Sequence, residues 1–110
     1  MANTFKNASL ANVNNSGYDT LYTTPSATTS IVLGVAIANK NTAAVTVKIQ
    51  FTDSSGSVTR QLLEDVSIPG NTTLEVLAGQ KYVLEAADLL KVQAGSASSL
   101  DVVMGLMEIT

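Results

Sequence analysis

The chain has 110 residues, a net charge of −3, a mean hydropathy of +0.25, and no cysteine, histidine or tryptophan. Without cysteine and histidine it lacks disulfides, thiolate nucleophiles and the residues that most often bind zinc or act as general bases. Only 14% of its residues are charged, against about 25% in a typical soluble domain, and its six basic residues do not cluster, which disfavours binding to nucleic acid or to an anionic membrane.

The first extended segment covers residues 4–13. It places Phe5, Leu10 and Val13 among stretches rich in asparagine. Such a segment can pair with a sheet of its own chain or lie on a neighbouring chain, so we interpret residues 1–16 either as an N-terminal arm or as an edge strand. In the arm interpretation, deletion of the arm would weaken binding to a partner and leave the sandwich folded.

The apolar runs along the chain are short. The first seven residues contain no apolar signal-peptide core, and the longest apolar run, residues 31–38, is far below the roughly 20 residues that span a bilayer. We therefore expect a protein that is made in the cytoplasm and has neither a membrane nor a nucleic acid as its partner.

Alternation with a period of two dominates the middle of the chain. Large apolar side chains occupy the odd positions of residues 31–38 and smaller ones the even positions, which predicts a strand with one large and one small face. Residues 45–52 alternate between apolar and polar, which is typical of a strand with one buried and one solvated face. The asparagine-rich residues 39–42 predict a hairpin connection between these two strands.

Shorter strands and turns follow in the second half. Turn residues at 53–57, 69–71 and 78–80 separate the expected strands, and residues 64–65 indicate a bend. Residues 85–91 contain helix formers and leave two options open, a turn or a single helical turn. Over the whole chain we expect extended segments, about eight of them strands, at residues 4–13, 18–23, 31–38, 45–52, 58–63, 66–68, 72–77, 81–84, 89–94 and 100–109.

The last expected strand is apolar on both faces. Its faces are Leu100, Val102, Met104 and Leu106 on one side and Val103, Met107 and Ile109 on the other. A strand of this kind is either central in a sandwich or covered by a partner. Gly105 inside it indicates a bulge or a close approach of another backbone.

No catalytic template finds its residues in this chain. The carboxylate pairs Glu64–Asp65 and Glu85–Asp88 come without aromatic sugar platforms, and we interpret them as solvated charges at bends. Residues 53–56 offer one carboxylate where a calcium loop needs several. Because no histidine is present to activate a serine, we expect no enzyme and no catalytic, cofactor-binding or metal-binding residue.

About eight short strands with regularly spaced turn residues predict an all-β fold: an antiparallel β-sandwich or jelly roll with an extended N-terminal segment, in one domain over residues 1–110. Few charges together with a positive mean hydropathy indicate that apolar surface is buried against another chain. We name six residues of the two terminal segments as candidates for this interface: Phe5, Leu10, Val13, Met104, Met107 and Ile109.

Several segments, taken in order, resemble a family of small virion structural proteins from tailed bacteriophages, including those that infect cyanobacteria. Each segment alone is a weak signal, but their order and spacing extend over nearly the whole chain. Ala87 stands where this family pattern leads us to expect a glycine. The segments are MANTFKN at residues 1–7, LYTTPSATTSIV at 21–32, IPG at 68–70, VLEAADLLKV at 83–92, and the ending SSLDVV…EIT at 98–110.

The resemblance implies a β-sandwich in the virus particle, without catalytic residues or cofactors. It implies a capsid decoration or cement protein that stabilises the shell as a homo-oligomer, for which a trimer is one option. Its partners would be the major capsid protein or other virion proteins, and its location the virion.

Two alternatives stay open. One is a structural protein of the same fold in the neck, the tail or a fibre, which copy number per particle would distinguish from decoration. The other, of a different class, is a carbohydrate-binding or adhesion module. That module would need an exposed cluster of tyrosines and carboxamides, for which the candidates are Tyr18, Tyr22, Asn14 and Asn15.

Overall fold

The computed structural model of the chain describes residues 2–54, 56–77 and 80–110. Met1, Ser55, Ala78 and Gly79, which belong to the predicted N-terminal segment, the 53–57 turn and the 78–80 connection, lie outside the described residues. No helix that could cross a membrane occurs in the described part of the chain. The strands are β1 (Asn3–Leu10), β2 (Asp19–Thr23), β3 (Thr29–Asn39), β4 (Val45–Asp53), β5 (Val58–Ile68), β6 (Thr73–Glu75), β7 (Tyr82–Leu84), β8 (Leu89–Ala94) and β9 (Leu100–Ile109).

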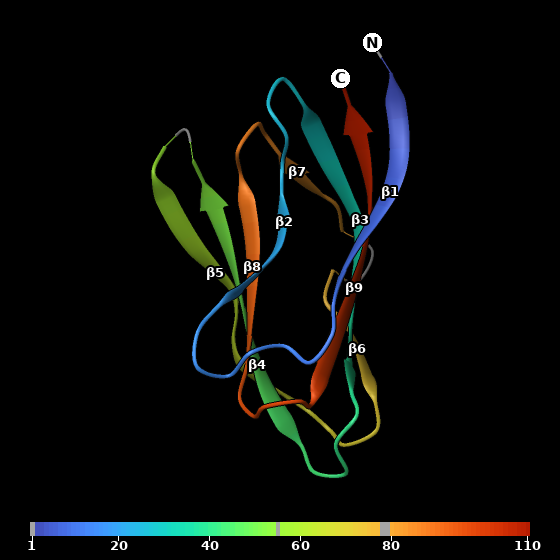
Figure 1. Cartoon of the computed structure of the whole chain (residues 1–110), viewed down its shortest axis with the longest axis vertical. Coiled ribbons are helices and arrows are strands. Elements are labelled where there is room, and N and C mark those ends of the chain that lie inside the picture. Colours follow the sequence, from blue (N-terminus) through green and yellow to red (C-terminus); the bar gives the residue numbers. More distant parts are fainter. Residues whose placement is uncertain (1, 55, 78–79) are drawn as a thin grey trace.

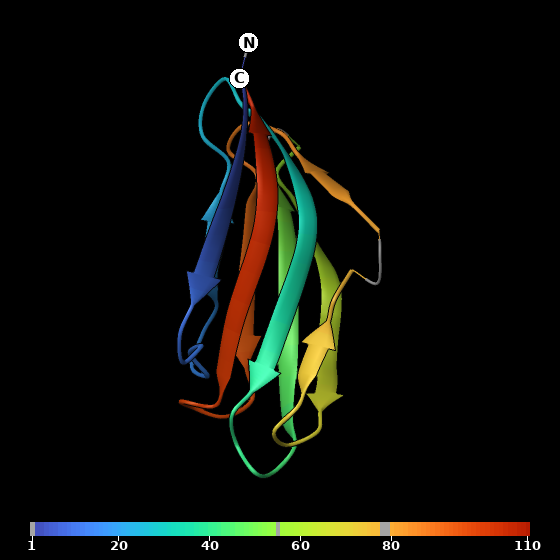
Figure 2. The ribbon, with the colours of Figure 1, turned by 90° about the vertical axis from the view of Figure 1, so that its right-hand side faces the viewer.

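Two antiparallel sheets pack face to face (Figure 1 and Figure 2). Sheet A has the order β1-β9-β3-β6, and β7 pairs with a different part of β3 from β6. Sheet B has the order β2-β8-β4-β5. The chain passes repeatedly from one sheet to the other, which is the jelly-roll arrangement. The predicted fold class, all-β in two antiparallel sheets, is therefore confirmed.

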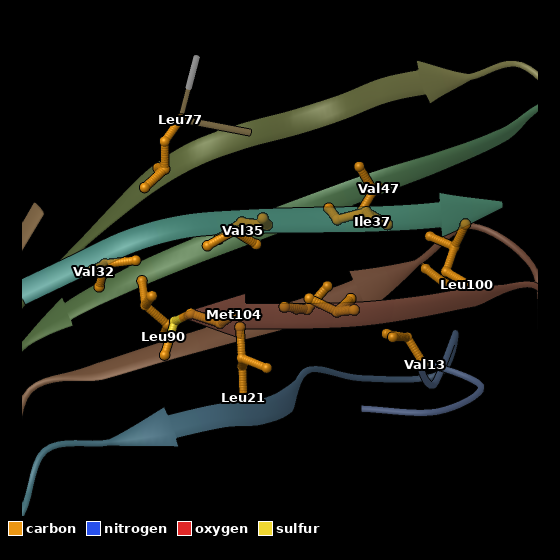
Figure 3. Packing of buried hydrophobic residues seen from close by; sticks show 14 of the residues in the cluster. Val13, Leu21, Val32, Val35, Ile37, Val47, Leu77, Leu90, Leu100 and Met104 are labelled. Carbon is orange, nitrogen blue, oxygen red and sulfur yellow. The ribbon is translucent and has the colours of Figure 1, made fainter. Parts of the chain in front are cut away.

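The core fills the space between the two sheets (Figure 3). Strand β9 contributes one complete face to it, because Leu100, Val102, Met104 and Leu106 are all buried, in the alternation that the sequence predicted. Burial of one such side chain contributes roughly 1.5–3 kcal/mol to folding. The sheets are therefore held together mainly by apolar packing.

Strand β3 contains a bulge, after which its side chains point to the opposite side from the one that simple alternation predicts. Val32 and Gly34 lie opposite adjacent residues of β9, so Leu33 is an extra residue in the ladder. An extra residue reverses the alternation of side chains. Val32 and Val35 therefore both point into the core, whereas Leu33 is exposed. The predicted division of this strand into a large and a small face is wrong.

Residues 39–42 connect the two sheets and do not form a hairpin, because β3 belongs to sheet A and β4 to sheet B. The buried side chain of Asn39 holds this crossing. Its Nδ2 donates to the carbonyl oxygens of Ile68 at 2.9 Å and Ala43 at 3.0 Å. Its Oδ1 accepts from the amide of Asn41 at 2.9 Å. The residue types predicted a change of direction correctly, but not which strands it joins.

The N-terminal segment forms an edge strand. β1 pairs antiparallel with β9 along its length, and Val13, which follows it, is fully buried. Of the two interpretations of residues 1–16, the edge strand therefore holds for residues 3–10. Deletion of residues 1–13 would remove a strand of sheet A and a core side chain, so it would not leave the sandwich intact as the arm interpretation expected.

The bend expected at residues 64–65 is a bulge within the continuous strand β5. The register between β4 and β5 shifts beside Lys48, whose Nζ lies 2.8 Å from Asp65 Oδ1 and 3.3 Å from Glu64 Oε1. Hydrogen bonds with Asp65 and then Glu64 hold the pKa of Lys48 above its usual value. This carboxylate pair is exposed and ion-paired.

Residues 85–88 form a turn, and no helical turn is present there. The amide of Asp88 donates to the carbonyl oxygen of Glu85 at 3.0 Å, and β8 begins at the next residue. Ala87 has a φ of 69°, a left-handed conformation that costs a residue with a Cβ roughly 1–2 kcal/mol. Alanine therefore occupies a position whose backbone conformation favours glycine.

Candidate interaction surface

The exposed large apolar side chains of the described residues all lie on one surface, the outer face of sheet A, which is the side turned away from sheet B. Strand register and burial place them there on four strands. They are Phe5 on β1 (74% exposed), Val103 on β9 (55%), Leu33 on β3 (39%) and Val83 on β7 (58%). Scattered exposed apolar residues are ordinary on a protein surface, but their concentration on one face makes this face the candidate interaction surface.

Four of the side chains on this face form a continuous row across the sheet, which we call the apolar row. Phe5 lies opposite Met107, Met107 lies opposite Ile31, and Ile31 lies opposite Val83. Three strand spacings of about 4.8 Å separate the first from the last, so the row is roughly 14 Å wide. Met107 and Ile31 are half-buried between their neighbours.

A strip without side chains lies beside the apolar row. Gly105 lies opposite Asn7 on one side and Gly34 on the other. A Cβ added at either glycine would meet nothing within 4 Å, so both face open space. Val103 stands on the far side of the strip, opposite Ala36. The strip is therefore a place where the backbone of the sheet is not covered by side chains at these two positions.

Charged groups lie at one end of this face. The register of the described strands places Glu75 and Asp101 there, beyond the apolar row and the glycine strip. Asp101 is ion-paired with Lys40 at 3.0 Å. Its pKa is below the usual value, mainly because it accepts a hydrogen bond from the amide of Asn12 and then because of Lys40. The other outward positions of the described strands on this face are uncharged, and Lys81 and Glu85 flank the two ends of β7.

An apolar hollow opens at the edge of sheet A formed by β7. It has a volume of about 240 Å³ and is lined by Phe51, Leu62, Tyr82, Val83 and Leu90, from both sheets. A cavity of roughly 150 Å³ with an apolar lining is enough to bind benzene. The hollow can therefore hold an aromatic ring.

A polar network joins the two sheets beneath β1. Glu108 is 6% exposed, and its Oε2 accepts a hydrogen bond of 2.5 Å from the hydroxyl of Tyr22, which comes from sheet B. The Tyr22 hydroxyl also lies 2.7 Å from Ser30 Oγ, and Lys6 Nζ lies 3.0 Å from Glu108 Oε1. Burial, and then the hydrogen bond with Glu108, raise the pKa of Tyr22 to about 12. The hydrogen bond from Tyr22, and then that from Lys6, lower the pKa of Glu108.

We expect the stability of the protein to decrease in acid through Glu108. Because the pKa of Glu108 is lower in the folded than in the unfolded chain, its contribution is present above the ordinary value of 4.5 and is lost as the pH falls through the folded pKa. The free energy of unfolding, measured in urea from pH 7 to pH 3 (roughly the window in which acid unfolding titrates carboxylates), should therefore decrease less steeply for Glu108→Gln than for the wild type. Equal slopes for the two proteins would contradict this assignment; Asp101, whose pKa is also lowered, is unchanged in both.

Three carboxylates approach one another where the end of β4 meets the turn between β7 and β8. One oxygen each of Asp53, Glu85 and Asp88 lies within 4.8 Å of the others. The two oxygens of the buried Asp88 accept hydrogen bonds from the amides of Ser54 at 3.0 Å and Glu85 at 2.9 Å. These bonds give Asp88 a role in holding the 85–88 turn against the end of β4.

Of the six residues named as interface candidates, three lie on the outer face of sheet A and three pack against or within the core. Phe5 is exposed, and Met107 and Ile109 are half-buried on the outer face. Leu10 is half-buried and packs against the core. Val13 and Met104 are fully buried in the core, so their prediction as interface residues is corrected: their side chains have no surface to offer a partner.

Sequence reasoning did not name three exposed residues of this face, Val103, Leu33 and Val83. Val103 could have been found, because the alternation in residues 100–109 already placed it on the second face with Met107. Leu33 was concealed by the bulge in β3, and Val83 by the shortness of β7.

The tyrosine and carboxamide cluster considered for carbohydrate binding is not one exposed surface. The Tyr22 hydroxyl is engaged between the sheets, as described above. The hydroxyl of Tyr18 accepts a hydrogen bond from Gln61 Nε2 at 2.9 Å. Asn14 Oδ1 accepts from the amide and the hydroxyl of Ser16. The polar groups of Tyr22, Tyr18 and Asn14 therefore form hydrogen bonds within the protein.

No protein-family model matches the chain, and no curated protein matches it in sequence. Solved structures share its fold. A chain of the Bacillus endospore appendages, which are disulfide-linked pili, aligns with a TM-score of 0.58 at 10% identity, over 98% of this chain and 88% of that one. A chain of the acid-stable capsid of the Helicobacter pylori bacteriophage KHP30 aligns with a TM-score of 0.56 at 16% identity, over 100% and 94%.

A chain of the capsid of cyanophage Pam1 also shares the fold, with a TM-score of 0.51 at 15% identity, over 96% of this chain and 83% of that one. At such identities the similarity concerns the fold alone. This chain therefore has a jelly-roll structural fold that also occurs in proteins of phage capsids and of a pilus.

Proposed function

We propose that this chain is a structural protein of a bacteriophage particle that binds to the capsid shell in many copies and stabilises it, without enzymatic activity. Its location is the virion, and its partner is the major capsid protein or another virion protein. The observation that carries the proposal is the outer face of sheet A, where the exposed large apolar side chains gather on a surface with little charge. The fold shared with phage capsid proteins supports the choice of partner.

The outer face supplies most of the area that a specific interface buries. Its three long strands contain 8, 10 and 11 residues. With about 3.4 Å per residue and about 4.8 Å per strand, four neighbouring strands cover roughly 30 by 19 Å, or about 600 Å². A specific interface buries about 800 Å² on each partner. One copy therefore offers somewhat less than such an interface on this face, and docking would also use residues at its border.

Stabilisation of the shell follows from mass action. A protein that binds the assembled shell but not its free subunits stabilises the shell by RT ln(1 + [L]/Kd) per site, or about 2.7 kcal/mol at about a hundredfold excess over Kd. The driving force is burial of apolar surface, at about 25 cal/mol per Å². The strip over Gly34 and Gly105 lets a side chain of the shell approach the sheet closely.

A charge placed on the outer face should weaken docking. We expect Val103→Glu to weaken binding to purified shells at least about tenfold, because an unpaired carboxylate in an apolar interface costs more than about 1.4 kcal/mol. Thr20→Glu is the matched control, since Thr20 is also exposed on a strand but belongs to sheet B. Cosedimentation of each folded variant with shells that lack the protein measures the effect. Equal binding of the two variants would exclude this face as the docking surface.

The number of copies in purified particles distinguishes decoration from the alternative, a neck, tail or fibre protein of the same fold. Closed symmetry gives roughly hundreds of copies for a protein that covers a shell, and roughly six to a few dozen for a neck or tail component. Quantitative mass spectrometry of purified particles supplies this number. Absence from the particle would overturn both assignments.

A further inference from the structure

Phe5 is an aromatic ring that projects into solvent from a rigid support. It is the most exposed of the large apolar residues in the described chain. Its strand, β1, is paired with β9 and forms one edge of sheet A. Because the ring stands on a paired strand and not on a loose tail, little conformational entropy is lost when it docks against another molecule.

The apolar hollow lies at the opposite edge of the same sheet. Figure 2 shows β1 at one edge and β7 at the other. Val83, which lines the hollow, is the last member of the apolar row that begins with Phe5. The exposed ring and the hollow are therefore at the same level along the strands, about 14 Å apart.

We propose that copies of this chain associate head to tail, with the Phe5 ring of one copy inserted into the apolar hollow of the next. The proposal deepens the multimer of the proposed function by naming its contact, and its tests do not involve the shell. The ring matches the hollow in chemistry, because the lining of the hollow contains no charged residue. It also matches in size, because about 240 Å³ exceeds the roughly 150 Å³ that accepts benzene.

The positions of the Phe5 ring and of the apolar hollow determine the symmetry of the assembly. Within one chain, Phe5 cannot reach the hollow, because the two lie on opposite edges of one sheet. Between copies, a contact that joins different surfaces is heterologous, and it closes into a ring or continues as a row. A ring of this kind leaves the middle of the outer face, around Val103 and the glycine strip, available to the shell.

Cysteine pairs test this contact directly, because the chain contains no native cysteine. The cysteine must keep the Phe5 ring in place, so we put it at Asn7, which is exposed on the same face of β1 two residues away. We expect a mixture of Asn7→Cys and Val83→Cys proteins to form a disulfide-linked heterodimer under mild oxidation. The double variant carrying both changes should give a ladder of linked species that ends at the size of the ring. A disulfide within one chain is not an option, since its Cα atoms must lie within about 7 Å and the two positions are more than about 14 Å apart.

The matched control for cross-linking is Val103→Cys mixed with Asn7→Cys. Val103 is as exposed as Val83, but it does not line the hollow. The proposal requires the Val83 pair to link faster than the Val103 pair. Equal rates would show random collision and would overturn it.

Sedimentation of the uncross-linked protein supplies a second test. We expect the wild type to sediment as a trimer or larger species. For Phe5→Ser and Val83→Ser, the protein concentration at which the assembly dissociates into monomers should rise at least about tenfold. This is the effect of losing about 1.4 kcal/mol from one contact. Val103→Glu, which the proposed function expects to lose the shell, should keep the wild-type mass. If Val103→Glu dissociated into monomers and Phe5→Ser did not, the proposed contact would be overturned and the proposed function would be unaffected. A monomer at every concentration, a dimer that grows no further, or a monomer that binds an apolar dye in the hollow would also overturn it.

Discussion

Gly70→Ala is expected to destabilise the protein by about 3 kcal/mol or more, a large fraction of the roughly 5–15 kcal/mol by which an ordinary domain is stable. A Cβ at this position would lie 2.1 Å from the carbonyl oxygen of Thr42 and 2.5 Å from its carbonyl carbon. Both are backbone atoms of the segment that crosses from β3 to β4, so neither can rotate away. The amide of Asn71 also donates to the carbonyl oxygen of Asn41 at 3.0 Å. The glycine is therefore required by the close approach of two chain segments.

Gly105→Ala is the matched control for this prediction. A Cβ at Gly105 meets nothing within 4 Å, and a strand position favours a side chain over glycine. We expect its unfolding midpoint in urea to equal or exceed that of the wild type, while the midpoint of Gly70→Ala decreases strongly. A small effect at Gly70 would mean that the two crossing segments separate easily.

The strands of the second half were predicted most accurately. Residues 89–94 and 100–109 have in the structure the bounds that the sequence indicated, because each alternates without interruption between core and outer positions. For the last strand, the same alternation also separated the buried face of Met104 from the outer face of Met107. Local pattern is sufficient where a strand pairs regularly on both sides.

The features that sequence reasoning missed depend on contacts between distant segments. Leu33 lies between apolar residues, and either face of β3 would accept each of them, so only pairing with β9 reveals the bulge. The hairpin predicted at residues 39–42 failed for the same reason, since a turn sequence does not state whether the next strand joins the same sheet.

The candidate surface was found only in part for a related reason. Composition indicated that some apolar surface is covered by another chain, and Phe5, Met107 and Ile109 do lie on the outer face. Val13 was assigned to the interface as part of the possible N-terminal arm, and Met104 because methionine suits an adaptable contact surface, with core packing as its alternative. Both terminal segments supply core side chains, and Met104 is one of them. Segment position alone cannot distinguish an apolar residue that faces the other sheet from one that faces solvent.

Asn39→Asp is expected to destabilise the protein by roughly 2–4 kcal/mol at neutral pH, although it replaces one nitrogen by an oxygen. The Nδ2 of Asn39 donates to carbonyl oxygens from Ile68 and Ala43, and the side chain is 3% exposed. A carboxylate there would direct a buried negative charge at two acceptors. The loss concerns the corner that joins the crossing from β3 to β4 with the end of β5.

The pH dependence of this variant distinguishes a specific electrostatic cost from a general packing defect. Burial beside acceptors disfavours the ionised form, so the pKa of the new carboxyl should be raised in the folded chain. The contribution of a raised pKa is present below the unfolded value and is lost as the pH rises through the folded one. Asn39→Asp should therefore regain stability relative to the wild type as the pH is lowered from 7 toward about 4, the ordinary carboxyl range. The control is Asn7→Asp, the same change at an exposed position of β1, for which urea unfolding should show little loss at pH 7 (the pH at which a free carboxyl is ionised). A loss at Asn39 that is independent of pH would mean that the corner fails through geometry and not through charge.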